Sequence, residues 1–168
     1  LTYTFHLRDA KWPDGQAITS QDFLYAFQRL ADPATAASYA WILDGHVKNG
    51  GDVVAGTLPV EELGVSAPDD KTFVIELEYP QTYFLSMLGS CGQFTPVRQD
   101  LVEQYGTDYA ATADKMVTCG PFTMVSSANR LYVFEKNQNY WNADAIHFDR
   151  IEMNIIDNGD TQLAMYEQ

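Results

Sequence analysis

Residues 11–33 read KWPDGQAITSQDFLYAFQRLADP and place a tight turn, a helix start and a helix stop in one short run. Pro13 suits the second position of a type I turn and Gly15 the fourth, so the chain should reverse here. Thr19 is placed as the N-cap of a helix, with Asp22 completing an acidic form of the capping box. The stretch therefore predicts a turn followed by a helix that begins directly after Thr19.

The predicted helix carries one apolar stripe. Phe23, Phe27 and Leu30 recur at helical spacing, and Pro33 disfavours helix in the residue before it. Burial of these three side chains contributes roughly 1.5–3 kcal/mol each. The stripe is therefore first of all a packing face, and the helix should end near Ala31.

The remaining sequence mixes strand and helix patterns without a regular βαβ repeat, which predicts an α+β fold. Strands are expected near residues 3–7, as a hairpin over 65–78, and over 121–126, 131–136 and 150–156. Helices are expected over residues 81–89, 98–105 and 160–168.

Composition excludes several classes of protein. The 168 residues are 46% hydrophobic, enough for a core in one domain or two small lobes. The formal charge of −13 repels phosphates and anionic lipids, so we expect no nucleic-acid partner. No run approaches the ~20 apolar residues that span a bilayer.

The sequence lacks the motifs of catalysis and metal binding. It contains no Gly-x-Ser-x-Gly, His-Glu-x-x-His, phosphate-loop or Cys-x-x-Cys pattern, and its three histidines lie far apart. The adjacent acids Asp69 and Asp70 are typical of a solvated turn rather than of paired catalytic carboxylates. We therefore predict no catalytic residue, no metal site and no cofactor.

Five segments of the chain form an ordered set: they are residues 11–33, the run ADPATAASYA at 31–40, LGV at 63–65, GPF at 120–122 and EKNQNYW at 135–141. A single segment would not be decisive, but five in the same order and at similar separations are specific. This order is typical of the oligopeptide-binding proteins of ABC importers, and the chain resembles that family over essentially its whole length.

The resemblance implies an incomplete type II periplasmic-binding-protein-like fold with mixed-sheet lobes. Residues 1–97 would form the small second lobe, and residues 98–168 a segment of the first, peptide-clasping lobe. Family members are several hundred residues long, with a lipoprotein signal and a large third domain. We therefore expect this chain to be a fragment that lacks both, with a lipid anchor as the whole protein's only link to the membrane.

The function implied by the resemblance is transport. The protein would be a monomer that captures oligopeptides in the periplasm or on the outer face of the cell membrane. It would deliver them to the permease subunits of an ABC transporter and perform no covalent chemistry. Two alternatives stay open: the same fold binding a dipeptide, nickel chelate, haem or signalling peptide, and an acidic extracellular hydrolase domain with two carboxylates about 5–10 Å apart.

Three residues are candidates for ligand binding. By resemblance, Tyr39 lines the cavity that receives peptide side chains, although a partly buried core tyrosine is the alternative; Trp41 is a neighbouring candidate. The family often has an acidic residue facing the ligand where this chain has Gly159, a place that Asp160 fills only after a one-residue shift. Helix N-capping by Asn158 or Asp160 is the alternative there.

Cys91 and Cys119 are the only cysteines. Each stands just ahead of a turn-rich segment that lies near a domain crossover in the resembling family. The resemblance therefore makes them a possible disulfide, and two unrelated buried thiols are the alternative.

Overall fold

Two compact units make up the chain. A computed structural model describes residues 1–167. The first unit consists of Leu1–Asp9 and Ile18–Gln99, and the second of Ala10–Ala17 and Asp100–Gln168. The chain thus enters the second unit for a short stretch before it returns to the first.

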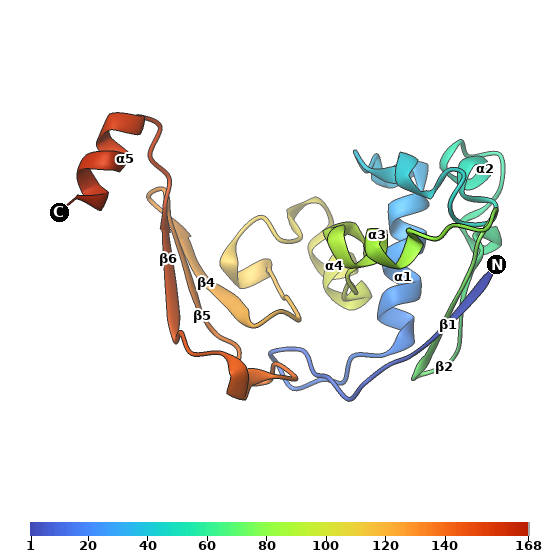
Figure 1. Cartoon of the computed structure of the whole chain (residues 1–168), viewed down its shortest axis with the longest axis horizontal. Coiled ribbons are helices and arrows are strands. Elements are labelled where there is room, and N and C mark those ends of the chain that lie inside the picture. Colours follow the sequence, from blue (N-terminus) through green and yellow to red (C-terminus); the bar gives the residue numbers. More distant parts are fainter. Residues whose placement is uncertain (168) are drawn as a thin grey trace. The chain divides into compact units, whose positions relative to one another are not determined.

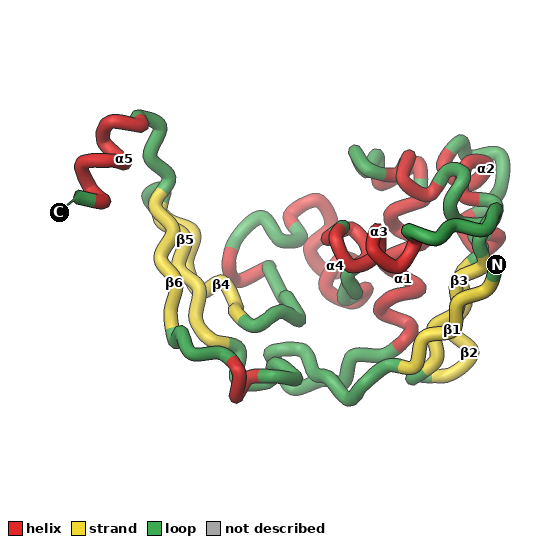
Figure 2. Tube along the Cα trace, in the orientation of Figure 1, coloured by secondary structure: helices red, strands yellow, loops and turns green. Residues whose placement is uncertain are grey.

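Each unit contains one three-stranded sheet, and helices alternate irregularly with strands, which confirms the α+β class (Figures 1 and 2). The strands are β1 (Thr2–His6), β2 (Val65–Asp69), β3 (Thr72–Glu76), β4 (Phe122–Ala128), β5 (Leu131–Lys136) and β6 (Arg150–Asn154). The α-helices are α1 (Ser20–Ala31), α2 (Gly50–Val54), α3 (Phe84–Ser90), α4 (Gln99–Tyr105) and α5 (Gly159–Tyr166).

Helix α1 begins and ends where the sequence predicts. Thr19 is its N-cap and forms the capping box with Asp22, whose carboxylate accepts a hydrogen bond from the Thr19 backbone N–H at 2.8 Å. After the helix, the Asp32 carboxylate accepts from the Ala34 N–H at 2.9 Å and starts a short 3₁₀ turn. Local hydrogen bonds therefore define both ends of α1.

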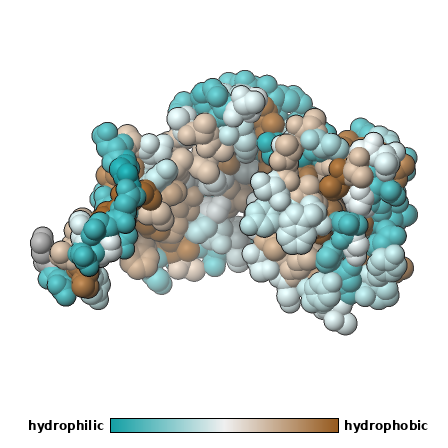
Figure 3. Space-filling model, turned by 90° about the horizontal axis from the view of Figure 1, so that it is seen from above, coloured by the Kyte–Doolittle hydropathy of each residue, from teal (hydrophilic) through white to brown (hydrophobic). Residues whose placement is uncertain are grey.

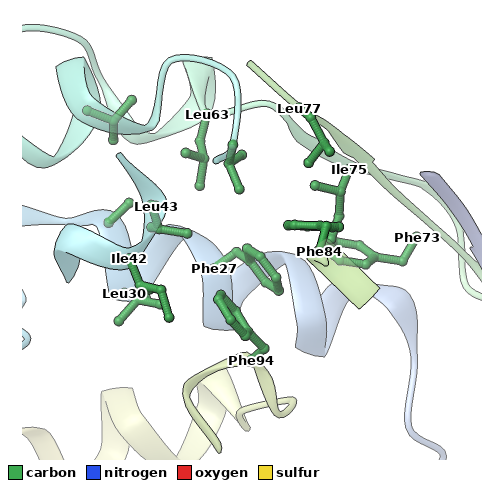
Figure 4. Packing of buried hydrophobic residues seen from close by; sticks show 13 residues of the cluster. Phe27, Leu30, Ile42, Leu43, Leu63, Phe73, Ile75, Leu77, Phe84 and Phe94 are labelled. Carbon is green, nitrogen blue, oxygen red and sulfur yellow. The ribbon is translucent and has the colours of Figure 1, made fainter. Parts of the chain in front are cut away.

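The core of the first unit lies between α1 and the antiparallel sheet of order β1-β3-β2 (Figure 4). Phe27 of α1 is 1% exposed, and its ring centroid lies 5.4 Å from that of Phe73 and 5.1 Å from that of Phe94. Phe84 of α3 and Leu43 are fully buried in the same cluster. The apolar stripe of α1 is thus the packing face that its spacing predicts.

The helix predicted over residues 81–89 begins only at Phe84, so the sequence prediction was wrong for its first turn. Residues 82–83 form a turn, and the segment before them bonds to an earlier loop. Val47 and Leu77 form an isolated antiparallel bridge, and the Gln81 side-chain amide donates to the Gly45 carbonyl at 2.7 Å. These long-range bonds outweigh the local preference for a helix.

The predicted turn of residues 12–15 lies in the second unit. The Gly15 N–H donates to the Trp12 carbonyl at 2.9 Å, and Trp12 is buried. The Asn139 side chain donates to the Pro13 carbonyl at 2.8 Å, and the buried Asn137 donates to Gly120 at 3.0 Å. Three of the segments that carry the family resemblance therefore meet in one place.

The sheet of the second unit has the order β4-β5-β6, with every neighbouring pair antiparallel. Val133 in the central strand is buried, whereas every residue of β6 is exposed. Apolar side chains such as Met153 and Leu163 reach the surface. Figure 3 colours the hydrophobic residues of the visible surface brown. The described part of this unit thus leaves apolar surface uncovered.

Candidate functional site

Tyr39 and Trp41 form a pair of exposed aromatic rings on the first unit. Their side chains are 51% and 62% exposed, and their ring centroids lie 6.3 Å apart with 37° between the ring planes. Neither ring is enclosed by the core. The geometry therefore places two of the three predicted ligand-binding residues side by side.

The backbone beneath these rings is held in place. Trp41 belongs to the short 3₁₀ helix η2 (Ala40–Leu43), in which Ile42 and Leu43 are buried. The Asp44 N–H donates to the Trp41 carbonyl at 3.1 Å, and the Ile42 N–H donates to Tyr39 at 3.0 Å. The next two residues thus anchor the segment in the core while Trp41 is presented to solvent.

A left-handed residue precedes the aromatic pair. Ala36 has φ 50° at the C-terminus of η1 (Pro33–Thr35), a conformation that is uncommon for a residue with a Cβ atom. Such strained positions persist only where the surrounding structure imposes them, and they occur preferentially at functional sites. The left-handed conformation of Ala36 therefore marks this loop as one whose backbone is fixed by the surrounding structure.

Asp160 lies in the second unit, in the first turn of α5, and its side chain is exposed. The N-cap of this helix is Asn158, whose side-chain oxygen accepts from the Thr161 N–H at 2.9 Å. The capping role considered for Asp160 therefore belongs to Asn158. A part for Asp160 in ligand binding stays a prediction.

Cys91 and Cys119 are both half-buried thiols in the structure. Cys91 belongs to the first unit and directly follows α3, whereas Cys119 belongs to the second unit and precedes β4. A disulfide between them stays a prediction.

A polar pocket that the sequence reasoning missed lies elsewhere on the first unit and has a volume of about 370 Å³. The Glu78 carboxylate accepts a hydrogen bond from the Asn49 backbone N–H at 3.2 Å, and this bond offsets part of its negative charge. The only sequence signal was the glycine-rich run before residue 57. The pocket is lined by Asp44, Gly45, Asn49, Gly50, Gly51, Asp52, Glu78 and Tyr79.

The glycines of this pocket permit a close approach of two chain segments. A Cβ atom on Gly50 would lie 2.1 Å from the Leu43 carbonyl oxygen, and one on Gly51 would lie 2.5 Å from a carboxylate oxygen of Asp44. Only glycine fits at Gly50 without a backbone shift. The pocket wall therefore depends on the packing of α2 against η2.

Two surface interactions near the sheet of the first unit shift pKa values. The Glu76 carboxylate hydrogen-bonds the Lys48 ammonium at 2.6 Å and raises the pKa of Lys48. The backbone N–H of Lys71 donates to the Asp69 carboxylate at 2.8 Å and is the main cause of the lowered pKa of Asp69. Both are structural contacts, and neither belongs to the aromatic pair.

Within residues 1–167, no three His, Cys, Asp or Glu side chains are grouped so that they could hold a metal ion. In the same residues, no helix is long and apolar enough to cross a membrane.

Comparison with known proteins assigns the family. Residues 1–168 match the model of the bacterial extracellular solute-binding proteins, family 5 Middle. The chain therefore belongs to the bacterial extracellular solute-binding proteins of family 5, which confirms the resemblance seen in the sequence.

Individual relatives support the same family. The chain is 42% identical to the periplasmic oligopeptide-binding protein OppA of Salmonella typhimurium over 142 residues, which are 83% of this chain and 26% of that protein. It is 33% identical to a dipeptide-binding protein of Lactococcus lactis over 174 residues, covering 100% of this chain and 31% of that protein.

A solved structure extends the similarity to the fold. The structure of Listeria monocytogenes OppA bound to peptide matches with a TM-score of 0.93 and 36% identity, covering 99% of this chain and 33% of that one. The fold is accordingly that of an incomplete type II periplasmic-binding-like protein. The chain spans about a third of the length of the relatives it matches.

Proposed function

We propose that the protein to which this chain belongs captures oligopeptides outside the cytoplasmic membrane and delivers them to the permease subunits of an ABC transporter. The observation that carries the proposal is the match, over nearly the whole chain, to a solved OppA that is bound to peptide. The relatives named above are solute-binding proteins rather than enzymes, which supports capture without covalent chemistry. We further propose that the protein acts as a monomer, in the periplasm or as a lipid-anchored protein on the outer face of the membrane.

In this proposal, residues 1–97 belong to a small lobe and residues 98–168 to part of the lobe that clasps the peptide. The division of the chain into two compact units near residue 99 supports it, with the difference that Ala10–Ala17 belong to the second unit. Lobes of the whole protein would close over an extended peptide and bind its backbone by strand-like hydrogen bonds. Water in the side-chain pockets would rearrange around different peptides and so permit broad specificity.

Tyr39 and Trp41 are the proposed ligand contacts of the first unit, and Asp160 that of the second. An exposed tyrosine offers an apolar ring with a hydrogen-bonding tip, a combination suited to varied side chains. Asp160 would supply a negative charge for a cationic group of the peptide. Support for the aromatic pair is its exposure on an anchored segment.

The test is peptide binding by the full-length protein, measured by titration calorimetry and by mass spectrometry of ligands that co-purify. We expect Tyr39→Ala to weaken binding of some peptides more than others without lowering the melting temperature. Tyr79→Ala is the matched control, since Tyr79 is 61% exposed but lies in the polar pocket instead. Absence of peptide binding by the wild type would refute the function, and a loss confined to Tyr79→Ala would move the site to that pocket.

A second candidate function is the binding of a dipeptide by the same fold. The dipeptide-binding protein of Lactococcus lactis is 33% identical over the whole of this chain, so a dipeptide is a specific alternative. Titration of the full-length protein with alanine peptides of two to six residues separates the two. Tightest binding of the dipeptide would favour the alternative, and tightest binding of a longer peptide would favour the oligopeptide.

A further inference from the structure

We infer that Trp41 determines side-chain specificity, forming with Tyr39 a surface that selects a flat apolar or aromatic side chain of the bound peptide. The inference rests on the proposed function, because it assigns a preference within peptide binding. Tyr39 and Trp41 lie with ring centroids 6.3 Å apart and ring planes inclined by 37°. Aromatic pairs attract at centroid separations of 4.5–7 Å in tilted arrangements, so a third ring can pack on this pair in the same way.

The pair is organised before any ligand arrives. The buried Ile42 and Leu43 hold the segment in the core, and backbone hydrogen bonds at Tyr39 and Trp41 fix the short helix. A rigid aromatic side chain with two rotatable bonds loses little entropy on binding. The selective contact therefore requires little rearrangement of this segment.

The polar tips of both rings are available for a ligand. Among the described residues, neither the Tyr39 hydroxyl nor the Trp41 indole N–H has a hydrogen-bond partner. Both tips belong to solvent-exposed side chains. They can therefore bond a peptide carbonyl while the ring faces contact its side chain.

The net charge of the first unit disfavours acidic side chains of the peptide. The first unit carries eleven Asp and Glu residues against five Lys and Arg. An acidic peptide side chain would be repelled by this excess negative charge. A cationic side chain would be attracted by the same negative charge. Binding of peptides with a cationic side chain therefore distinguishes ring packing from general electrostatic attraction.

The experiment measures peptide binding by the full-length protein with a positional series. The probes are tetra-alanine, the four tetra-alanine variants with one phenylalanine, and the corresponding four with one lysine. For the wild type we expect a phenylalanine peptide to bind about tenfold more tightly than tetra-alanine at one position. Trp41→Ala should weaken the phenylalanine peptide more than tetra-alanine and so reduce that preference to about threefold or less, whereas Trp41→Phe should keep most of it.

Trp141→Ala is the matched control, because Trp141 is 51% exposed beside another tyrosine but belongs to the second unit. It should retain the phenylalanine preference. The inference is overturned if Trp41→Ala keeps the preference, if it weakens all peptides equally, or if only the lysine peptides respond to it. Failure of the wild type to bind any of the peptides would instead refute the proposed function.

Discussion

Replacing Phe27 by alanine should remove a large part of the stability of the first unit. Phe27 is 1% exposed and contacts the rings of Phe73 and Phe94. An aromatic side chain buries about 150–250 Å², which corresponds to about 4–6 kcal/mol at about 25 cal/mol per Å². Because the unfolded chain already buries part of this area, about 3–4 kcal/mol remains, within the range for Phe→Ala in cores.

Hydrogen exchange measures this loss in a protein of several units, since it reports the free energy of opening segment by segment. Amides of α1 and β3 should lose protection by about 150-fold to about 700-fold in Phe27→Ala. Phe148→Ala is the control: that side chain is 71% exposed, so protection should change by about twofold or less. A loss of less than about fivefold in Phe27→Ala would refute the assignment of Phe27 to the centre of the core.

Two further predictions concern local interactions of the first unit. Thr19→Ala should lower the free energy of unfolding by about 1 kcal/mol because it removes the N-cap of α1, and Thr19→Ser should restore most of that loss. An unchanged melting temperature in Thr19→Ala would contradict the cap. The lowered pKa of Asp69 means that its contribution to stability is complete above the ordinary aspartate pKa and is lost as the pH falls through the folded-state value. Asp69→Ala should therefore be less stable than wild type at neutral pH, with a difference that shrinks in acid. A difference independent of pH between 7 and 2 in urea unfolding would count against this, and Asp70→Ala provides the neighbouring control.

The sequence determined the elements whose signals lie within a few residues. The capping box of Thr19 and Asp22, the turn from Trp12 to Gly15 and the apolar stripe of α1 depend on bonds and spacings inside one short segment. For that reason the bounds of α1 and the α+β class were predictable. The order of five short segments was also sufficient to identify the family, which the match over residues 1–168 confirms.

Tertiary structure decided what depends on segments far apart in the chain. The start of α3 at Phe84 accompanies the bridge between Leu77 and Val47 and the bond from Gln81 to Gly45, which no local pattern encodes. The contact between Asn139 and the turn at Pro13 likewise joins distant segments. Periodicity also left open whether Tyr39 is buried. Its exposure follows from the burial of Ile42 and Leu43, because those side chains occupy the core and leave the preceding aromatic rings in solvent.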